Sequence, residues 1–165
     1  CITLSHAWGW DPTAKFKTPA KVIEMLSEIC AKGGCLLLGV GPTPQGTIQP
    51  EVEVALRPVG EWLRKNGEAI YSTRTTPIYT NNEKNVWFTA NKDGKTLYAI
   101  VPQDDEKGIP RTISWEGNAP AKGAQIIDIA TKKSLSYVTK DGKTTVTLPL
   151  KANGTNGVAM KFRIK

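Results

Sequence analysis

Two segments in the first half of the chain carry apolar residues at helical spacing. Their stripes consist of Val22, Leu26, Ile29 and Cys30, and of Val52, Ala55, Leu56, Val59, Trp62 and Leu63. Such positions fall on one face of an amphipathic helix. Thr18 and Pro19 form a favourable start for the first helix, and Gly33 is suited to end it. The pattern predicts helices over residues 17–32 and 50–66.

Two runs of strand-forming residues alternate with these helices. Residues 1–4 read as the end of a strand, and residues 35–40 form a continuous apolar run. A run without alternation is typical of a strand that is buried on both faces. The order strand, helix, strand, helix predicts parallel strands with right-handed crossovers. Because two such units cannot cover both faces of a parallel sheet, we expect residues 1–70 to be part of a larger barrel or sheet.

The pattern changes near residue 70, after which no helical stripe occurs. Seven short runs of alternating or β-branched residues follow, at residues 86–89, 96–101, 112–115, 125–129, 134–138, 144–148 and 158–164. Asp93-Gly94 and Asp141-Gly142 are tight-turn sequences placed between runs that they would join as hairpins. Residues 71–165 are therefore predicted to form an antiparallel two-sheet β-sandwich, and the fold class is α/β followed by all-β.

Charge is distributed unevenly along the chain. The 165 residues carry a net charge of +7, and the excess lies in residues 71–165, which hold 15 Lys and Arg against 8 Asp and Glu. A basic half can indicate contact with nucleic acid. Here the Lys residues are scattered singly at turns and strand ends, without the clustered Arg and interleaved aromatics of phosphate-binding surfaces. We interpret them as solvating, edge-protecting residues and expect no nucleic-acid partner.

Composition and motifs exclude several further classes of site. No stretch approaches the ~18 apolar residues of a membrane-spanning helix, and no secretory signal pattern is visible, so no membrane partner is expected. Three Cys without a CxxC pair and a single His supply too few ligands for a metal site. Cys30 and Cys35 are expected to be buried thiols. The Gly-rich loop at 39–46 lacks the Lys-Ser/Thr pair of a P-loop. No metal or cofactor is predicted.

The most distinctive candidate for chemistry is the pair of aromatic residues Trp8 and Trp10, which flank Gly9. They follow the carboxyl end of a predicted strand, where α/β sheets place their sites. Aromatic rings in such positions stack on the apolar face of sugars. The alternative is that the rings are core, which stays open for Trp8 and is favoured for Trp10. His6 is interpreted as a hydrogen-bonding loop residue, and Asp11 as the cap of the turn that follows.

The carboxylates of the predicted helices do not form an obvious acid/base pair. They are Glu24, Glu28, Glu51, Glu53 and Glu61, and all lie off the apolar stripes. A glycosidase-type pair needs two carboxyl groups that converge on one site. We interpret these residues as solvated helix faces.

Several distinctive motifs occur together in the first 74 residues. They are Ile2-Thr3-Leu4 with Trp8-Gly9-Trp10, the segment 17–26, the segment 32–42 (KGGCLLLGVGP), Gly46-Thr47-Ile48, and the segment 60–71 (GEWLRKNGEAIY) followed by Thr73-Arg74. Together they resemble the α-L-fucosidase family of glycoside hydrolases. The sequence departs from the family pattern at Cys35 and Gly39, where Asn is usual, and at Trp10, where Tyr is common. Beyond residue 74 the resemblance is one of architecture, because these enzymes carry a C-terminal β-sandwich.

The resemblance implies that residues 1–70 are the last units of a TIM-like (β/α)8 catalytic barrel and that residues 71–165 are the C-terminal β-sandwich. The parent protein would be a retaining exo-glycosidase that removes terminal α-L-fucose from a fucosylated glycan or glycoconjugate. Its two catalytic carboxylates are expected upstream of Cys1, so this chain alone is expected to be inactive. Trp8 is the substrate-binding residue that the resemblance implies.

The family also implies a periplasmic, secreted or lysosomal location and no cofactor. The resemblance leaves the fucosyl linkage and the oligomeric state open.

A different class of function competes with the glycosidase hypothesis. The β-sandwich would be a non-catalytic carbohydrate-binding module that uses Trp87, Trp115 or Tyr98. Single aromatic residues on strands are more often core residues, and an exposed row of rings would be needed to favour this alternative.

Overall fold

A computed structural model describes residues 1–149, 152 and 154–164. The first seventy residues form β1 (Ile2–Thr3), α1 (Pro19–Ala31), β2 (Leu38–Gly39), α2 (Pro50–Asn66) and the 3-10 helix η1 (Gly67–Ala69). β1 and β2 pair in parallel, with Thr3 opposite Gly39. The predicted α/β order and the parallel pairing are therefore confirmed.

Both helices begin and end where local chemistry favours it. The side-chain oxygen of Thr18 accepts a hydrogen bond from the backbone N–H of Lys21, and Pro19 occupies the first turn. Past the other end of α1, Gly33 adopts a φ of 81°, a conformation that favours glycine. In α2 the acidic residues of the first turn and the basic residues of the last turn both suit the helix dipole. The predicted helices at 17–32 and 50–66 are confirmed.

The remainder of the chain is a two-sheet β-sandwich. Its strands are β3 (Trp87–Ala90), β4 (Thr96–Pro102), β5 (Thr112–Glu116), β6 (Ile126–Asp128), β7 (Ser134–Leu135), β8 (Tyr137–Lys140), β9 (Lys143–Thr147) and β10 (Gly157–Arg163). One sheet has the order β3-β4-β10-β6-β7 and the other β5-β9-β8, and every pairing in them is antiparallel. Both predicted hairpins are present, and no described residue after 80 lies in a helix.

The single strand predicted over 134–138 is wrong in one respect. Residues Ser134–Leu135 pair with β6 in one sheet, whereas Tyr137–Lys140 pair with β9 in the other. Between them, the carbonyl oxygen of Ser136 accepts a hydrogen bond from Thr147. The chain thus crosses from one sheet to the other within a continuous run of strand-forming residues.

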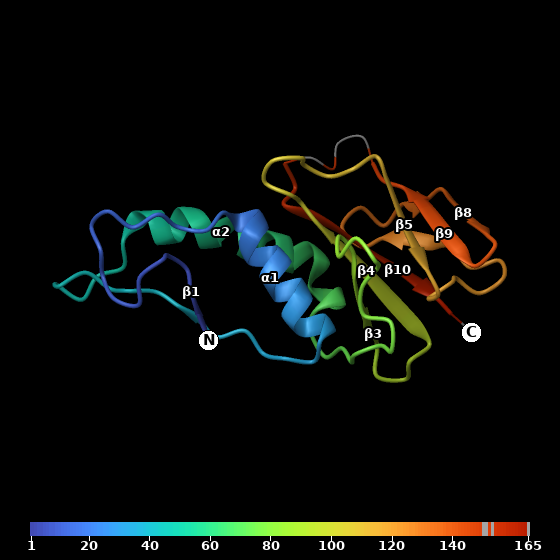
Figure 1. Ribbon diagram of the computed structural model, residues 1–165, viewed down its shortest axis with the longest axis horizontal. Coiled ribbons are helices and arrows are strands. Elements are labelled where there is room, and N and C mark those ends of the chain that lie inside the picture. Colours follow the sequence, from blue (N-terminus) through green and yellow to red (C-terminus); the bar gives the residue numbers. More distant parts are fainter. Residues whose placement is uncertain (150–151, 153, 165) are drawn as a thin grey trace.

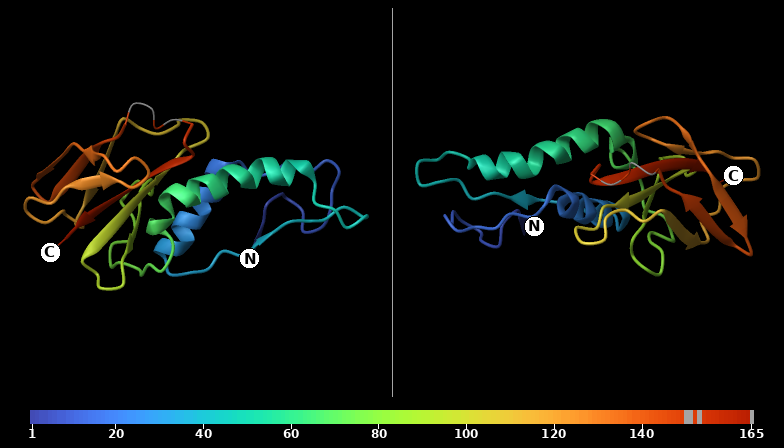
Figure 2. Two further views of the ribbon diagram at one scale, coloured as in Figure 1. Left: turned by 180° about the vertical axis from the view of Figure 1, so that it is seen from behind. Right: turned by 90° about the horizontal axis from the view of Figure 1, so that it is seen from above.

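Helices and sheets form three layers (Figure 1). The two helices lie on one side of the five-stranded sheet, and the three-stranded sheet lies on the other side. The loops that follow β1 and β2 extend away from the sandwich, beyond the start of α2, in all three views (Figure 2). Among the residues that the structure describes, no helix is long and apolar enough to cross a membrane.

The sandwich has an aromatic core between its sheets. Trp115 contacts Phe88 edge-on, with ring centroids 5.3 Å apart, and stacks on Phe162 at 5.8 Å. All three rings are buried. A second core lies between the helices and the outer face of the five-stranded sheet, where Trp62 is only 3% exposed and its Nε1 donates to the carbonyl oxygen of Gly157 at 2.9 Å. The two parts of the chain therefore share this second core, and a domain boundary at residue 70 stays a prediction.

The predicted burial of residues 35–40 on both faces is not observed. Only Leu38–Gly39 are in a strand, and Leu37 is 66% exposed. Cys35 is exposed and Cys30 half-buried, so the expectation of two buried thiols is wrong for Cys35. The reason is that β2 has one strand neighbour, β1, among the described residues, which leaves most of this apolar run without a covering layer.

Candidate functional site

The loop after β1 places two large aromatic rings in solvent. The side chain of Trp8 is 71% exposed and that of Trp10 is 43% exposed. Neither ring is buried by the described part of this chain, and the choice between a sugar-stacking ring and a ring packed in the top of a larger barrel stays a prediction for both residues. The exposed part of each indole, larger for Trp8 than for Trp10, is accessible to a ligand at the carboxyl end of a parallel strand pair.

The base of this loop is fixed by hydrogen bonds. The hydroxyl of Thr3 donates to the carbonyl oxygen of Ser5 at 2.7 Å, and the hydroxyl of Ser5 accepts from the N–H of Ala7 at 3.2 Å. Lys17 reaches back and donates from its ammonium group to the carbonyl oxygens of Thr3 and Ser5, at 2.7 and 3.2 Å. Leu4 is fully buried beneath them. These hydrogen bonds hold the backbone between β1 and Trp8 in one conformation.

His6 and Asp11 interact with each other at the other end of the loop. The ring Nε2 of His6 lies 3.0 Å from Oδ2 of Asp11. The other carboxylate oxygen accepts from both the hydroxyl and the backbone N–H of Thr13, each at 2.7 Å. These Thr13 bonds first, and His6 after them, hold the pKa of Asp11 below its usual value. The predicted roles, a hydrogen-bonding His and a turn-capping Asp, are confirmed.

A close backbone contact brings the loops after β1 and β2 together. A Cβ atom on Gly41 would lie 2.5 Å from the carbonyl carbon and oxygen of Gly9 and 2.7 Å from the N of Trp10. No side chain fits there, so glycine at position 41 is what allows this approach. The pattern of apolar and polar residues does not predict this contact. Its only signals were a glycine between two tryptophans and a glycine just after the next strand.

The motif at residues 60–74 attaches the end of α2 to the sandwich. The side chain of Thr89 in β3 donates to the carbonyl oxygen of Ala69 at 2.7 Å. Arg74 and Ala90 exchange backbone hydrogen bonds of 2.8 and 2.9 Å. At the end of α2, a Cβ atom on Gly67 would lie 2.6 Å from the ring of Tyr71, so the ring packs directly on the glycine. These contacts are structural and lie far along the chain from Trp8.

The carboxylates of the helices lie on the surface, where three of them form ion pairs and Glu51 and Glu61 are exposed. Glu24 pairs with Lys21 at 2.7 Å, and Glu28 and Glu53 pair with basic residues one helical turn away. Their interpretation as solvated helix faces is confirmed. No group of three or more His, Cys, Asp or Glu side chains within the described part of the chain is arranged to hold a metal ion.

The three aromatic residues of the carbohydrate-module alternative are not available to a ligand. Trp87, Trp115 and Tyr98 are all buried. Trp115 lies in the core between the sheets, and Tyr98 lies in the core beneath the helices. The alternative in which these rings bind sugar is therefore wrong, because neighbouring residues cover all three side chains.

Comparison with known proteins identifies the strand–helix part of the chain, which comprises β1, α1, β2 and α2. A family model described as "Alpha-L-fucosidase" matches residues 1–68, the segment that holds both strand-end loops. The chain belongs to the α-L-fucosidase family. Plasma α-L-fucosidase of Homo sapiens is 37% identical over 105 residues, which are 61% of this chain and 22% of that protein. Tissue α-L-fucosidase of Mus musculus is 37% identical over 126 residues, which are 69% of this chain and 27% of that protein.

Solved structures of α-L-fucosidases share the fold of the whole chain. Isoenzyme 1 from Paenibacillus thiaminolyticus is 26% identical with a TM-score of 0.80, and the match covers 100% of this chain and 39% of that structure. The Thermotoga maritima enzyme in complex with fucose is 23% identical with a TM-score of 0.78, covering 97% of this chain and 38% of that structure. This member of the α-L-fucosidase family thus spans about a quarter of the length of its curated relatives.

Proposed function

We propose that the protein containing this chain is a retaining exo-glycosidase that hydrolyses terminal α-L-fucosyl linkages of a glycan or glycoconjugate. The observation that carries the proposal is the coincidence of the α-L-fucosidase match at residues 1–68 with an anchored loop that presents Trp8 at the carboxyl end of a parallel strand pair. Sites of α/β barrels are built from such strand-end loops. In the proposal, residues 1–70 contribute the last units of that barrel and residues 71–165 form the sandwich that follows it.

The proposed reaction is a double displacement. A carboxylate attacks the anomeric carbon and displaces the aglycone, whose oxygen receives a proton from a second carboxyl group. Water, activated by that second group, then releases fucose from the glycosyl-enzyme, and the two inversions leave the α configuration retained. Among the carboxylates of residues 1–70, Asp11 is held in a loop turn, Glu24, Glu28 and Glu53 are held in helix-surface ion pairs, Glu68 is paired with Lys161, and Glu51 and Glu61 are exposed on a helix surface. We therefore assign both catalytic groups to parts of the enzyme outside this chain.

Within this chain, the proposed substrate contact is the ring of Trp8. Its π face would pack on the apolar side of the fucose ring, where C–H groups and the C5 methyl group offer hydrophobic surface. The hydrogen-bonded base of the loop supports this role, because a contact that acts in the transition state needs a fixed position. No metal or organic cofactor enters this mechanism.

A stereochemical assay tests the proposed activity. The whole protein should hydrolyse 4-nitrophenyl α-L-fucoside, and proton NMR should detect the α anomer of fucose first. A matched control is 4-nitrophenyl α-L-galactoside, which carries a hydroxymethyl group in place of the methyl group, and it should react more slowly. Absence of hydrolysis, or release of the β anomer first, would contradict the proposal.

The isolated chain offers a second test of the proposed activity. Residues 1–165 alone should not turn over the aryl fucoside, because the covalent step needs a nucleophile that we place elsewhere. Measurable turnover by the isolated chain would show that one of its own carboxylates is catalytic. The periplasmic, secreted or lysosomal location expected from the family stays a prediction. Its relatives include proteins named plasma and tissue α-L-fucosidase.

A further inference from the structure

The outer face of the five-stranded sheet is covered by the helices at one end only. Tyr98 in β4, Lys161 in β10 and Ile127 in β6 lie side by side in register across three strands. On the side nearer the helices, the next row includes Ile100 and Ala159, which are buried in the second core. On the opposite side, the next row includes Thr96, which is half-buried, and Arg163, which is exposed. The sheet therefore exposes a shelf of polar side chains beside the end of α2.

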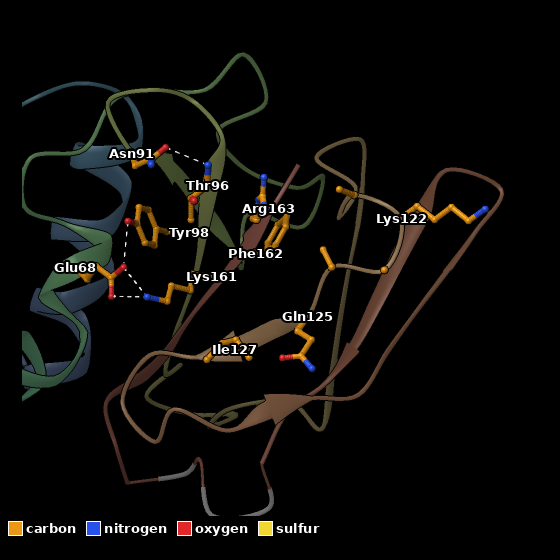
Figure 3. A pocket seen from close by; sticks show the side chains of 13 residues that line it. Glu68, Asn91, Thr96, Tyr98, Lys122, Gln125, Ile127, Lys161, Phe162 and Arg163 are labelled. Atoms are coloured by element: carbon orange, nitrogen blue, oxygen red, sulfur yellow. Dashed lines mark hydrogen bonds and ion pairs between the residues drawn. The ribbon is translucent and has the colours of Figure 1, made fainter. Parts of the chain in front are cut away.

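This shelf forms the floor of a groove of about 720 Å³ (Figure 3). Glu68 in η1 bounds it at the helix end, and Asn91 bounds it beside β4. A turn at residues 121–124 closes the far side, and this turn is attached to the sheet by a hydrogen bond of 2.8 Å from the N–H of Ala121 to the carbonyl oxygen of Arg163. A volume of this size is within the range of small-molecule sites.

One acidic residue neutralises one of the two cations on the floor. The ammonium group of Lys161 lies 2.8 and 3.0 Å from the two carboxylate oxygens of Glu68. The hydroxyl of Tyr98 donates to the same carboxylate at 3.3 Å, and burial together with this negative charge raises the pKa of Tyr98 to about 12. Figure 3 shows Lys161 directed toward Glu68, whereas Arg163 lies beside Thr96.

The second cation has no counter-ion among the residues that the structure describes. Arg163 is exposed, and within the described residues its guanidinium group makes no ion pair or hydrogen bond. Two amide side chains share the groove with it. The amide oxygen of Asn91 accepts from the backbone N–H of Thr96 at 3.0 Å, which leaves its NH2 group as a donor, and Gln125 is exposed. Lys122 lies on the rim, and its side chain extends outward in Figure 3.

We propose that this groove is a second saccharide site, which binds the acidic group of an anionic sugar, a carboxylate or a sulfate ester. A guanidinium group matches two oxygens of either anion with a pair of parallel hydrogen bonds. The amides of Asn91 and Gln125 hydrogen-bond hydroxyl groups of the same sugar. The site is distinct from the loop of Trp8, because it lies on the sandwich, and it does not depend on the proposed fucosidase activity.

The same groove is a poor site for nucleic acid. Binding of single strands uses exposed aromatic rings on which bases stack. The aromatic residues that line the groove, Tyr98 and Phe162, are both buried, and Phe162 belongs to the core on the other side of the sheet. The floor therefore offers charge and hydrogen bonds without a stacking surface, which suits a hydroxylated ring that carries an acid.

Calorimetric titration of the protein with three oligosaccharides, two acidic and one neutral, tests the proposal. A hyaluronan hexasaccharide presents carboxylates only, a chondroitin sulfate hexasaccharide presents carboxylates and sulfate esters, and maltohexaose is the neutral control. At least one acidic probe should bind and maltohexaose should not. Arg163→Gln should weaken that binding about tenfold or more, the factor typical of a lost charge-assisted hydrogen bond. Arg163→Lys keeps the positive charge but lacks the paired N–H donors of the guanidinium group. Its affinity should fall between those of the wild type and Arg163→Gln.

Two further variants separate a specific site from general attraction to a basic protein. Lys140→Gln removes an exposed cation from the β8–β9 hairpin, outside the groove, and should leave binding unchanged. Glu68→Gln removes the acid that competes for the cations and should strengthen binding about threefold or more. Circular dichroism and thermal melting check that each variant folds. If Arg163→Gln does not fold, the binding measured for Arg163→Lys tests the proposal in its place.

Four results would overturn the proposal. They are no binding of either acidic probe at millimolar concentration, equal binding of maltohexaose, an equal loss in Lys140→Gln and Arg163→Gln, or tighter Arg163-dependent binding of a single-stranded RNA hexamer. The comparison of hyaluronan with chondroitin sulfate identifies whether the carboxylate or the sulfate ester is the recognised group.

Discussion

The sandwich and the strand-end loops of this molecule treat their large apolar side chains in opposite ways. In the sandwich, Phe88, Trp115 and Phe162 are packed between two sheets that cover each other. Around β1 and β2, Trp8 and Leu37 are exposed, as are residues at the start of α2. The sandwich therefore stabilises itself by its own two layers, whereas the other region has apolar surface without a covering layer.

This difference links the sandwich to stability and the strand-end loops to binding. Contiguous exposed apolar surface marks a place where something else binds. The family match covers residues 1–68, which include the exposed rings, and the sandwich strands lie outside that match. The two regions are joined by Trp62 and the core beneath the helices. Substitutions in the three places should therefore have different consequences.

The largest loss of stability is expected in the sandwich core. Trp115→Ala removes a ring that contacts Phe88 and Phe162 and should lower the free energy of unfolding by about 4–5 kcal/mol, since the surrounding sheets cannot collapse into the space. Val138→Ala, on the exposed face of β8, is the matched control and should change it by less than about 0.5 kcal/mol. Chemical denaturation monitored by circular dichroism measures both. Equal effects would show that the packed core is not what stabilises the sandwich.

A slightly smaller loss is expected at the junction of the two regions. Trp62→Ala should lower the free energy of unfolding by about 3–4 kcal/mol, because the ring is buried beside a groove into which neighbouring side chains can relax. Trp62→Phe keeps an aromatic ring and removes the hydrogen bond to Gly157, so it should cost about 1–3 kcal/mol. If Trp62→Phe were as damaging as Trp62→Ala, the hydrogen bond rather than the packing would hold the junction.

The sequence predicted most of the secondary structure because that information is local. The caps at Thr18 and Gly33 and the two apolar stripes define the helices without reference to the rest of the fold. The hairpins at Asp93-Gly94 and Asp141-Gly142 are likewise encoded by adjacent residues. The sheet crossing at Ser136 was missed because strand propensity does not indicate which sheet a strand joins. Tertiary pairing decides that.

The candidate sites were predictable to different degrees. Trp8 was found because it follows a strand and has an unusual composition around it. The exposure of Leu37 was not predicted, since an apolar pattern does not show what covers a residue. The contact between Gly9 and Gly41 requires the register of β1 and β2, and the groove at Arg163 requires the register of three strands together with the extent of the helices.

A substitution in the exposed loop should affect activity rather than stability. Trp8→Ala in the whole enzyme should lower kcat/KM for an aryl α-L-fucoside about 10- to 1000-fold, because a contact made in the transition state is lost while the carboxylates remain. Trp8→Phe keeps a smaller ring and should lose less. Thermal melting and far-UV circular dichroism should be unchanged, since the ring is exposed. Wild-type activity would place Trp8 outside the pocket, and a collapse of the melting temperature would make it a structural residue.

The smallest expected effect concerns the border between the two regions, where Tyr98 donates to Glu68 at 3.3 Å. Burial and the charge of Glu68 raise the pKa of Tyr98 from 10.0 to about 12, so folding favours the neutral hydroxyl. The contribution of this hydroxyl to stability is fully present below pH 10 and is lost as the pH rises from 10 toward 12.

Tyr98→Phe should lower the free energy of unfolding by about 0.5–1.5 kcal/mol at pH 8. The variant should also lose less stability than the wild type between pH 9 and pH 11, when both are unfolded in urea. Tyr71→Phe, an exposed tyrosine near the same helix end, is the matched control and should follow the wild type. Parallel pH curves for Tyr98→Phe and the wild type would show that this hydroxyl does not link the helix end to the sheet.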